Sequence, residues 1–133
     1  MSKHPPTPGR TAAATTVRRR DRGQVAIEYL GFLPLLLLVG LLAIQAGLAA
    51  YAANQAGTGA RAGARMASMS TGDCDEQAGL DAMSDWTAGR AHIEDRSSSS
   101  DKVTCTARVD VPNIIPGVHL WGTAERSSTM PRT

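Results

Sequence analysis

A single carboxylate, Glu28, stands at the start of a long uncharged stretch. The next charged residue is Arg61, so residues 29–60 carry no Asp, Glu, Lys or Arg. A carboxylate at the centre of a bilayer costs about 2.5–3.5 kcal/mol, and less near the bilayer edge, so it requires a partner. We therefore predict that Glu28 is a functional residue whose charge is met by another group.

No pattern typical of an enzyme occurs in the sequence. Gly-x-Ser-x-Gly, a phosphate-binding loop, His-Glu-x-x-His and the twelve-residue calcium loop are all absent. We expect no catalysis, no cofactor and no metal site. The small acidic group is expected to be a solvated loop and the histidines to be ordinary surface or packing residues: Asp73, Asp75 and Glu76; His4, His92 and His119.

Two cysteines, Cys74 and Cys105, follow the uncharged stretch. A piece of about 60 residues has a marginal core, and a bridge closing a loop of about 30 residues would stabilise it by roughly 3–4 kcal/mol. Outside the cytoplasm a disulfide is the expected state. We predict a Cys74–Cys105 disulfide, with two free thiols as the alternative.

The apolar residues are concentrated in the run LGFLPLLLLVGLLAI, residues 30–44. A bilayer core of about 30 Å needs roughly 20 apolar residues in a helix, and residues 29–50 meet that length. A soluble helix that is apolar on every face would need a large protein around it, which 133 residues cannot supply. The run therefore predicts one membrane-spanning helix in contact with the lipid bilayer.

Charge is divided unevenly along the chain. Residues 1–22 hold six of the 14 basic residues and one of the 12 acids, so the remainder is net acidic. This division, with only five aromatic residues in total, argues against nucleic-acid binding. Basic residues stay on the cytoplasmic side of a membrane, which predicts a cytoplasmic N-terminus and an extracytoplasmic C-terminal part; the topology signal is Arg18, Arg19, Arg20 and Arg22.

Three segments are expected. We expect residues 1–23 to form a disordered basic leader. Residues 24–70 are expected to form a long helix that spans the membrane in its first half, and residues 71–133 a small exterior domain that contains the disulfide. Pro34 removes a backbone hydrogen bond from the long helix, so we expect a kink there.

Small residues recur every four positions in the second half of this helix. Such spacing lets another helix backbone approach closely, and packing would offset the cost of up to about 1 kcal/mol for each internal glycine. The alternative is an Ala/Gly-rich composition without a packing role. The residues are Ala49, Ala53 and Gly57 on one line, Ala52, Ala56, Ala60 and Ala64 on the next, and Gly59 and Gly63 as a Gly-x-x-x-Gly pair.

The exterior part predicts an α+β fold. Residues 78–92 place apolar residues at helical spacing, and residues 103–111 alternate apolar and polar side chains as a strand does. We expect residues 117–125 to form a returning strand that completes a β-hairpin. Residues 96–101 are expected to form a loop, and residues 126–133 a loose tail.

The junction GQVAIEYLGFLPLLLL, preceded by RRRDR, resembles the class III signal of type IV pilins and pseudopilins. Within that class the segment is similar to the TadE-like minor pseudopilins of the tight-adherence (Flp, type IVb) pilus. The similarity covers about residues 20–68. Its points of match are Ala26, Glu28, Tyr29, Pro34 and the leucine run, followed by Arg61, Ala62 and Arg65.

This resemblance implies that a prepilin peptidase cleaves after Gly23 on the cytoplasmic side. Gln24 would become the first residue and Glu28 the fifth, followed by the aromatic Tyr29. The new α-amino group at Gln24 and the Glu28 carboxylate could then neutralise each other between neighbouring subunits. The implied role is a membrane-held subunit that packs with other pilin or pseudopilin subunits through this helix and acts in assembly of a pilus or a related secretion apparatus.

Two other fates remain open. Ala50-Tyr51-Ala52 is an Ala-x-Ala pattern that signal peptidase could cut before Ala53, which would release a secreted disulfide domain. Without cleavage the chain would be a single-pass anchored protein that retains Met1 or Ser2. In either case the small domain would have an unknown binding role.

Overall fold

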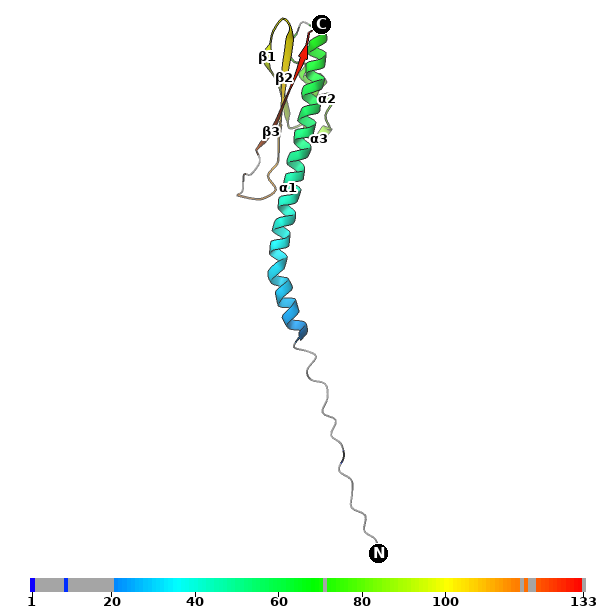
Figure 1. Cartoon of the computed structure of the whole chain (residues 1–133), viewed down its shortest axis with the longest axis vertical. Helices are drawn as coiled ribbons and strands as arrows, with labels where there is room; N and C mark the ends of the chain where they lie inside the picture. The colour runs from blue at the N-terminus through cyan, green and yellow to red at the C-terminus, as the bar shows by residue number, and fades with distance from the viewer. Residues whose placement is uncertain (2–8, 10–20, 71, 118, 120–121, 133) are drawn as a thin grey trace. The chain divides into compact units, whose positions relative to one another are not determined.

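The structure is a computed structural model, and it describes most of the chain from Asp21 onward, together with Met1 and Gly9 (Figure 1). Residues 2–8, 10–20, 71, 118, 120–121 and 133 are not described, and in the first helix the side chains are described from Ala26. The predicted disordered leader therefore lies largely outside the described residues. The chain divides into two compact units, Met1–Leu37 and Leu38–Thr133.

One helix, α1 (Asp21–Met69), contains both the apolar run and the small-residue segment. Its sequence is dominated by Leu and Ala, which are strong helix formers, and the helix includes Pro34. Its length and apolar composition are sufficient for it to cross a membrane. The predicted long apolar helix is confirmed.

Two short helices follow, α2 (Glu76–Asp81) and α3 (Asp85–Ala88). Asp75 caps α2, because its Oδ1 accepts a hydrogen bond from the Ala78 amide at 2.9 Å. Ser84 is the N-cap residue of α3, and Gly89 ends that helix. The prediction of one helix over residues 78–92 is therefore wrong, because a second cap interrupts it and a strand begins at Ala91.

Three antiparallel strands form one sheet in the order β1-β2-β3: β1 (Ala91–Ser98), β2 (Lys102–Asp110) and β3 (Thr123–Pro131). The central strand β2 coincides with the predicted alternating segment. β2 pairs with β1 in the register that places Ala91 opposite Val109. It pairs with β3 in the register that places Lys102 opposite Pro131. The α+β class is confirmed, but the sheet has three strands instead of the two of a hairpin.

The two edge strands differ from the sequence prediction. Residues 96–98 belong to β1 and residues 126–131 belong to β3, although both segments were expected to be irregular. These strands are polar because much of the sheet face away from α1 is exposed. On this face hydroxyl pairs join β2 to β3, at 2.9 Å between Thr104 and Thr129 and at 2.8 Å between the buried Thr106 and Ser127. Pairing with β2 fixes the extended conformation that their Ser- and Thr-rich composition does not indicate.

The core of the unit Leu38–Thr133 lies between the sheet and the second half of α1, which run side by side in Figure 1. One face of the sheet contributes the side chains that alternation predicted. Small side chains of α1 form the opposite wall. The buried residues are Val103, Cys105, Ala107, Val109 and Val111 from β2 and its end, Ala91 and Ile93 from β1, Met83, and Ala52, Ala56, Ala60, Ala64 and Ala67 from α1.

A disulfide joins Cys74 to Cys105, in agreement with the pairing expected from the sequence. It links the segment between α1 and α2 to the middle of β2 across a sequence separation of 31 residues. On the chain-entropy model such a loop contributes roughly 3–4 kcal/mol. That contribution is large for a core in which many of the buried side chains are alanine.

Close contact between α1 and α2 depends on Gly59 and Gly79. A Cβ built on Gly79 would lie 2.9 Å from the Gly59 carbonyl oxygen and would also collide with the Cδ1 of Ile93. A Cβ built on Gly59 would lie 3.1 Å from the Gly79 carbonyl oxygen. The two helix backbones therefore meet directly at this point.

We predict that Gly79→Ala lowers the free energy of unfolding by about 1–3 kcal/mol, because the new methyl group overpacks a contact between two backbones. The measurement is thermal unfolding of the detergent-solubilised chain, followed by circular dichroism. Gly122→Ala is the matched control, since a Cβ there meets nothing within 4 Å. Equal melting temperatures for the two variants would contradict the close approach.

Candidate functional site

The N-terminal junction lies in the first turns of α1. The backbone of Gly23 and Gln24 is helical, and Arg22 also lies in this helix, but the side chains of residues 21–25 are not described. Of the predicted topology signal, Arg18, Arg19 and Arg20 lie outside the described residues. The expected cleavage point thus falls within continuous helix, one turn before Glu28.

Glu28 is exposed on the surface of α1. Its sequence neighbours Ile27 and Tyr29 are 71% and 72% exposed, which leaves the carboxylate on a largely apolar surface. Among the side chains described from Ala26 onward, none forms an ion pair with Glu28. The arrangement presents a single negative charge that a partner molecule can reach.

Apolar side chains cover the helix after this charge. Phe32, Leu33 and Leu37 are 52%, 52% and 66% exposed, and the neighbouring leucines are exposed to a similar extent. Exposed apolar residues at consecutive positions cannot all face one side of a helix. This surface suits contact with lipid or with other apolar helices all around.

The small residues of α1 serve two different surfaces of the same compact unit. Gly59 and Gly63 face α2 and the segment before it: a Cβ on Gly63 would lie 3.0 Å from the Asp75 carbonyl oxygen. The line of alanines from Ala52 to Ala64 is fully buried in the core. In both cases the closely packed partner lies within this chain.

The remaining line of small residues borders a groove. Ala49 and Ala53 line one side, and Ala124 and Arg126 of the edge strand β3 line the other, around a volume of about 390 Å³. Gly57 extends this line, because a Cβ there would lie 3.9 Å from the Arg126 Cγ. The groove is open to a partner, and its walls are small side chains and the edge of a sheet.

A buried amide, Gln45, fixes the loop between β2 and β3 to α1. Gln45 is only 2% exposed. Gln45 Nε2 donates to the Pro112 carbonyl at 3.0 Å, and Gln45 Oε1 accepts from the Ile114 amide at 3.0 Å. Both polar groups of the amide are therefore satisfied by backbone groups almost 70 residues away in the chain.

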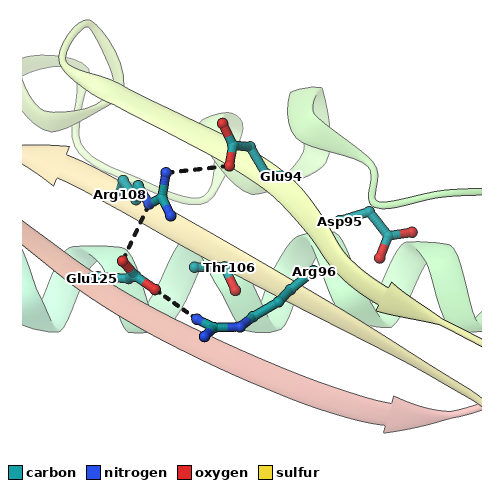
Figure 2. A pocket seen from close by; sticks show the side chains of 6 residues that line it. All are labelled: Glu94, Asp95, Arg96, Thr106, Arg108 and Glu125. Carbon is teal, nitrogen blue, oxygen red and sulfur yellow. Dashed lines mark hydrogen bonds and ion pairs between the residues drawn. The ribbon is translucent and has the colours of Figure 1, made fainter.

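The opposite face of the sheet carries a network of charges that Figure 2 shows on the side away from α1. Arg108 contacts Glu94 at 3.4 Å and Glu125 at 3.2 Å, and Arg96 contacts Glu125 at 2.9 Å, around a shallow hollow of about 340 Å³. These side chains are substantially exposed, so each pair contributes about 0–1 kcal/mol. The network is best explained as surface stabilisation of three neighbouring strands.

Metal binding has no support in the described part of the chain, where no group of three or more His, Cys, Asp or Glu is placed to hold an ion. Asp75, one of the acids expected to lie in a solvated loop, caps α2. Cys74 and Cys105 are bonded to each other in the disulfide.

The Ala-x-Ala pattern before Ala53 lies inside α1 and inside the compact unit. Cutting there would separate fully buried Ala52, and also Gln45 with its two hydrogen bonds, from the sheet they support. The folded domain therefore uses the helix on both sides of this pattern.

Residues 23–65 match the family model of TadE-like proteins. The N-terminal segment of this chain is TadE-like. The match covers about a third of the chain and ends before α2, so the disulfide and the sheet lie outside it. No curated protein and no solved structure matches the chain.

Sequence reasoning missed the side chains of α1 that form hydrogen bonds with distant segments of the chain. Gln55 Oε1 accepts from the Ser84 amide at 3.1 Å, and Tyr51 Oη donates to Ser84 Oγ at 3.0 Å. With Gln45, these residues anchor irregular segments to the TadE-like helix. A glutamine within an apolar run was the available signal, since a buried amide needs partners.

We predict that Gln45→Leu raises the hydrogen-exchange rate of the Ile114 amide and lowers the free energy of unfolding by about 1–3 kcal/mol, because two partly buried backbone groups lose their partner. The measurement is amide exchange of the peptide covering residues 111–117. Gln77→Leu is the control, because Gln77 bonds only Asp81 on the surface of α2. Unchanged exchange at Ile114 would show that Gln45 does not hold the loop.

Proposed function

We propose that this chain is a membrane-anchored minor pseudopilin that acts in assembly of a type IVb (Flp/Tad) pilus or a related secretion apparatus. The observation that carries the proposal is the TadE-like segment over residues 23–65. That segment begins at Gly23, where the prepilin-type signal would have its scissile bond. The apolar helix that follows is long enough to cross a membrane.

The proposed mechanism is assembly by charge pairing. Cleavage after Gly23 creates a positive α-amino group at Gln24, and Glu28 of a neighbouring subunit provides the negative charge. Either charge alone would be costly in an apolar helix bundle, whereas the pair is compensated. Pairing at one position along each helix also sets the axial register of the subunits.

The proposed partners follow from this arrangement. A prepilin peptidase processes the cytoplasmic leader, the lipid bilayer holds the first half of α1, and other pilin or pseudopilin subunits pack along the helix. The groove beside Ala49, Ala53 and Gly57 supports such packing, because small side chains allow close approach. The disulfide-containing domain would face the extracytoplasmic side, where a disulfide is stable.

We predict that the mature chain begins at Gln24, free or cyclised to pyroglutamate, in membranes of cells that contain a prepilin peptidase. The measurement is mass spectrometry of the N-terminal peptide. The matched control is the same cells with an inactive peptidase, in which the leader should remain attached.

Other N-termini would select the alternatives. A start at Met1 or Ser2 in the presence of active peptidase would identify an uncleaved single-pass anchor. A start at Ala53 would identify a secreted domain and would contradict both the pseudopilin proposal and the role of α1 in the core.

We predict that Glu28→Ala leaves membrane insertion intact and impairs pilus assembly, because the α-amino group of a neighbour then lacks its counter-charge. Glu28→Gln should have the same effect, since it retains size and removes charge. The measurements are alkaline extraction of membranes for insertion and electron microscopy of surface pili for assembly. Glu76→Ala, which removes an exposed acid of α2, is the control. Normal piliation in both Glu28 variants would refute charge pairing.

A further inference from the structure

The loop between β2 and β3 is unusually apolar for an exposed connection. No Asp, Glu, Lys or Arg occurs between Asp110 and Glu125. Within the described part of this loop Ile114 is 40% exposed, and Asn113 and Pro116 are also exposed. The described part of the loop therefore presents an exposed apolar side chain with no charged residue beside it.

The position of this loop along α1 is fixed by Gln45. Both hydrogen bonds of the Gln45 amide go to the loop, so Pro112 and Ile114 lie at the level of residue 45 of the helix. The uncharged stretch begins at Tyr29, and a bilayer core of about 30 Å is crossed by roughly 20 helical residues. Counted along the helix, Gln45 falls near the outer end of that span.

Several backbone groups at the start of this loop have partners within the chain. Irregular backbone is tolerated near the hydrocarbon region only where its N–H and C=O groups have partners. Gln45 occupies the Ile114 N–H and the Pro112 carbonyl, and the Val111 amide donates to the Gly122 carbonyl at 3.0 Å. Pro112 and Pro116 have no N–H to satisfy.

We infer that residues 112–117 form a second membrane contact, in which Ile114 enters the outer interface of the bilayer beside the anchor helix. The occupant of this surface is lipid, because the exposed Ile114 side chain is apolar and its loop is bonded to Gln45, near the outer end of the proposed membrane span. Ile44, which precedes Gln45 in α1, is 57% exposed. The helix and the loop therefore each present an exposed apolar side chain near Gln45. The inference rests on the membrane anchoring in the proposed function, and not on cleavage or on pilus assembly.

The test uses the full chain in vesicles of phosphatidylcholine and phosphatidylglycerol. A fluorescent amino acid is incorporated at Ile114, and nitroxide-labelled lipids serve as quenchers. The matched control has the same probe at Ser100, which is exposed in the turn at the other end of β2. A third chain carries it at exposed Asn113, in case the label at Ile114 disturbs the contacts with Gln45.

We expect several-fold stronger quenching at Ile114 and Asn113 than at Ser100, unchanged when the protein is diluted with lipid. Equal weak quenching at all three positions, in a chain that still floats with the vesicles, would overturn the loop contact and leave the anchor intact. Quenching that falls on dilution would assign the surface to a second copy and would also overturn the inference. Failure of the chain to float with the vesicles would overturn the anchor and the loop contact together.

Discussion

The structure depends on one helix that meets two different environments. The first part of α1 carries large apolar side chains that are exposed around the helix, and the second part carries alanine and glycine that are buried against its own domain. Lipid accepts bulky side chains on every face, whereas a small domain with few large side chains gains its contacts by bringing backbones close together. The change of residue type along α1 accompanies the change from exposed side chains in its first part to buried side chains in its second part.

A core built on alanine has limited hydrophobic stabilisation, since each buried alanine removes little apolar area from water. Three features of the unit Leu38–Thr133 compensate. The disulfide restricts the unfolded chain, the glycine contact between α1 and α2 increases packing density, and the amides of Gln45 and Gln55 bind backbone that regular structure leaves unpaired. The domain is therefore held to α1 by many short contacts, and removal of part of the helix would remove part of the core.

The elements that the sequence predicted well are those with local signals. A charge-free run predicted α1, strict alternation predicted β2, and two cysteines outside the run predicted the disulfide. The edge strands were missed because their outward faces are made of Ser, Thr and charged side chains, and their extended form depends on pairing with β2. The packing role of the small residues was predictable, but its partner was not. The residues that Gly59 and Gly63 approach lie in α2 and the segment before it, and only the folded chain brings them together.

Two polar residues lie near opposite ends of the apolar run, and their environments differ in kind. Gln45 is an amide with one donor and one acceptor group in use, and the chain's own loop satisfies both. Glu28 is an acceptor-only carboxylate when ionised, and it is exposed among apolar side chains without an ion-pair partner among those described. An internally satisfied group stabilises the fold, whereas an exposed carboxylate is solvated by water and requires a counter-charge only when it is transferred to an apolar environment. Gln45 therefore holds part of the domain to α1, whereas Glu28 makes no ion pair among the described side chains.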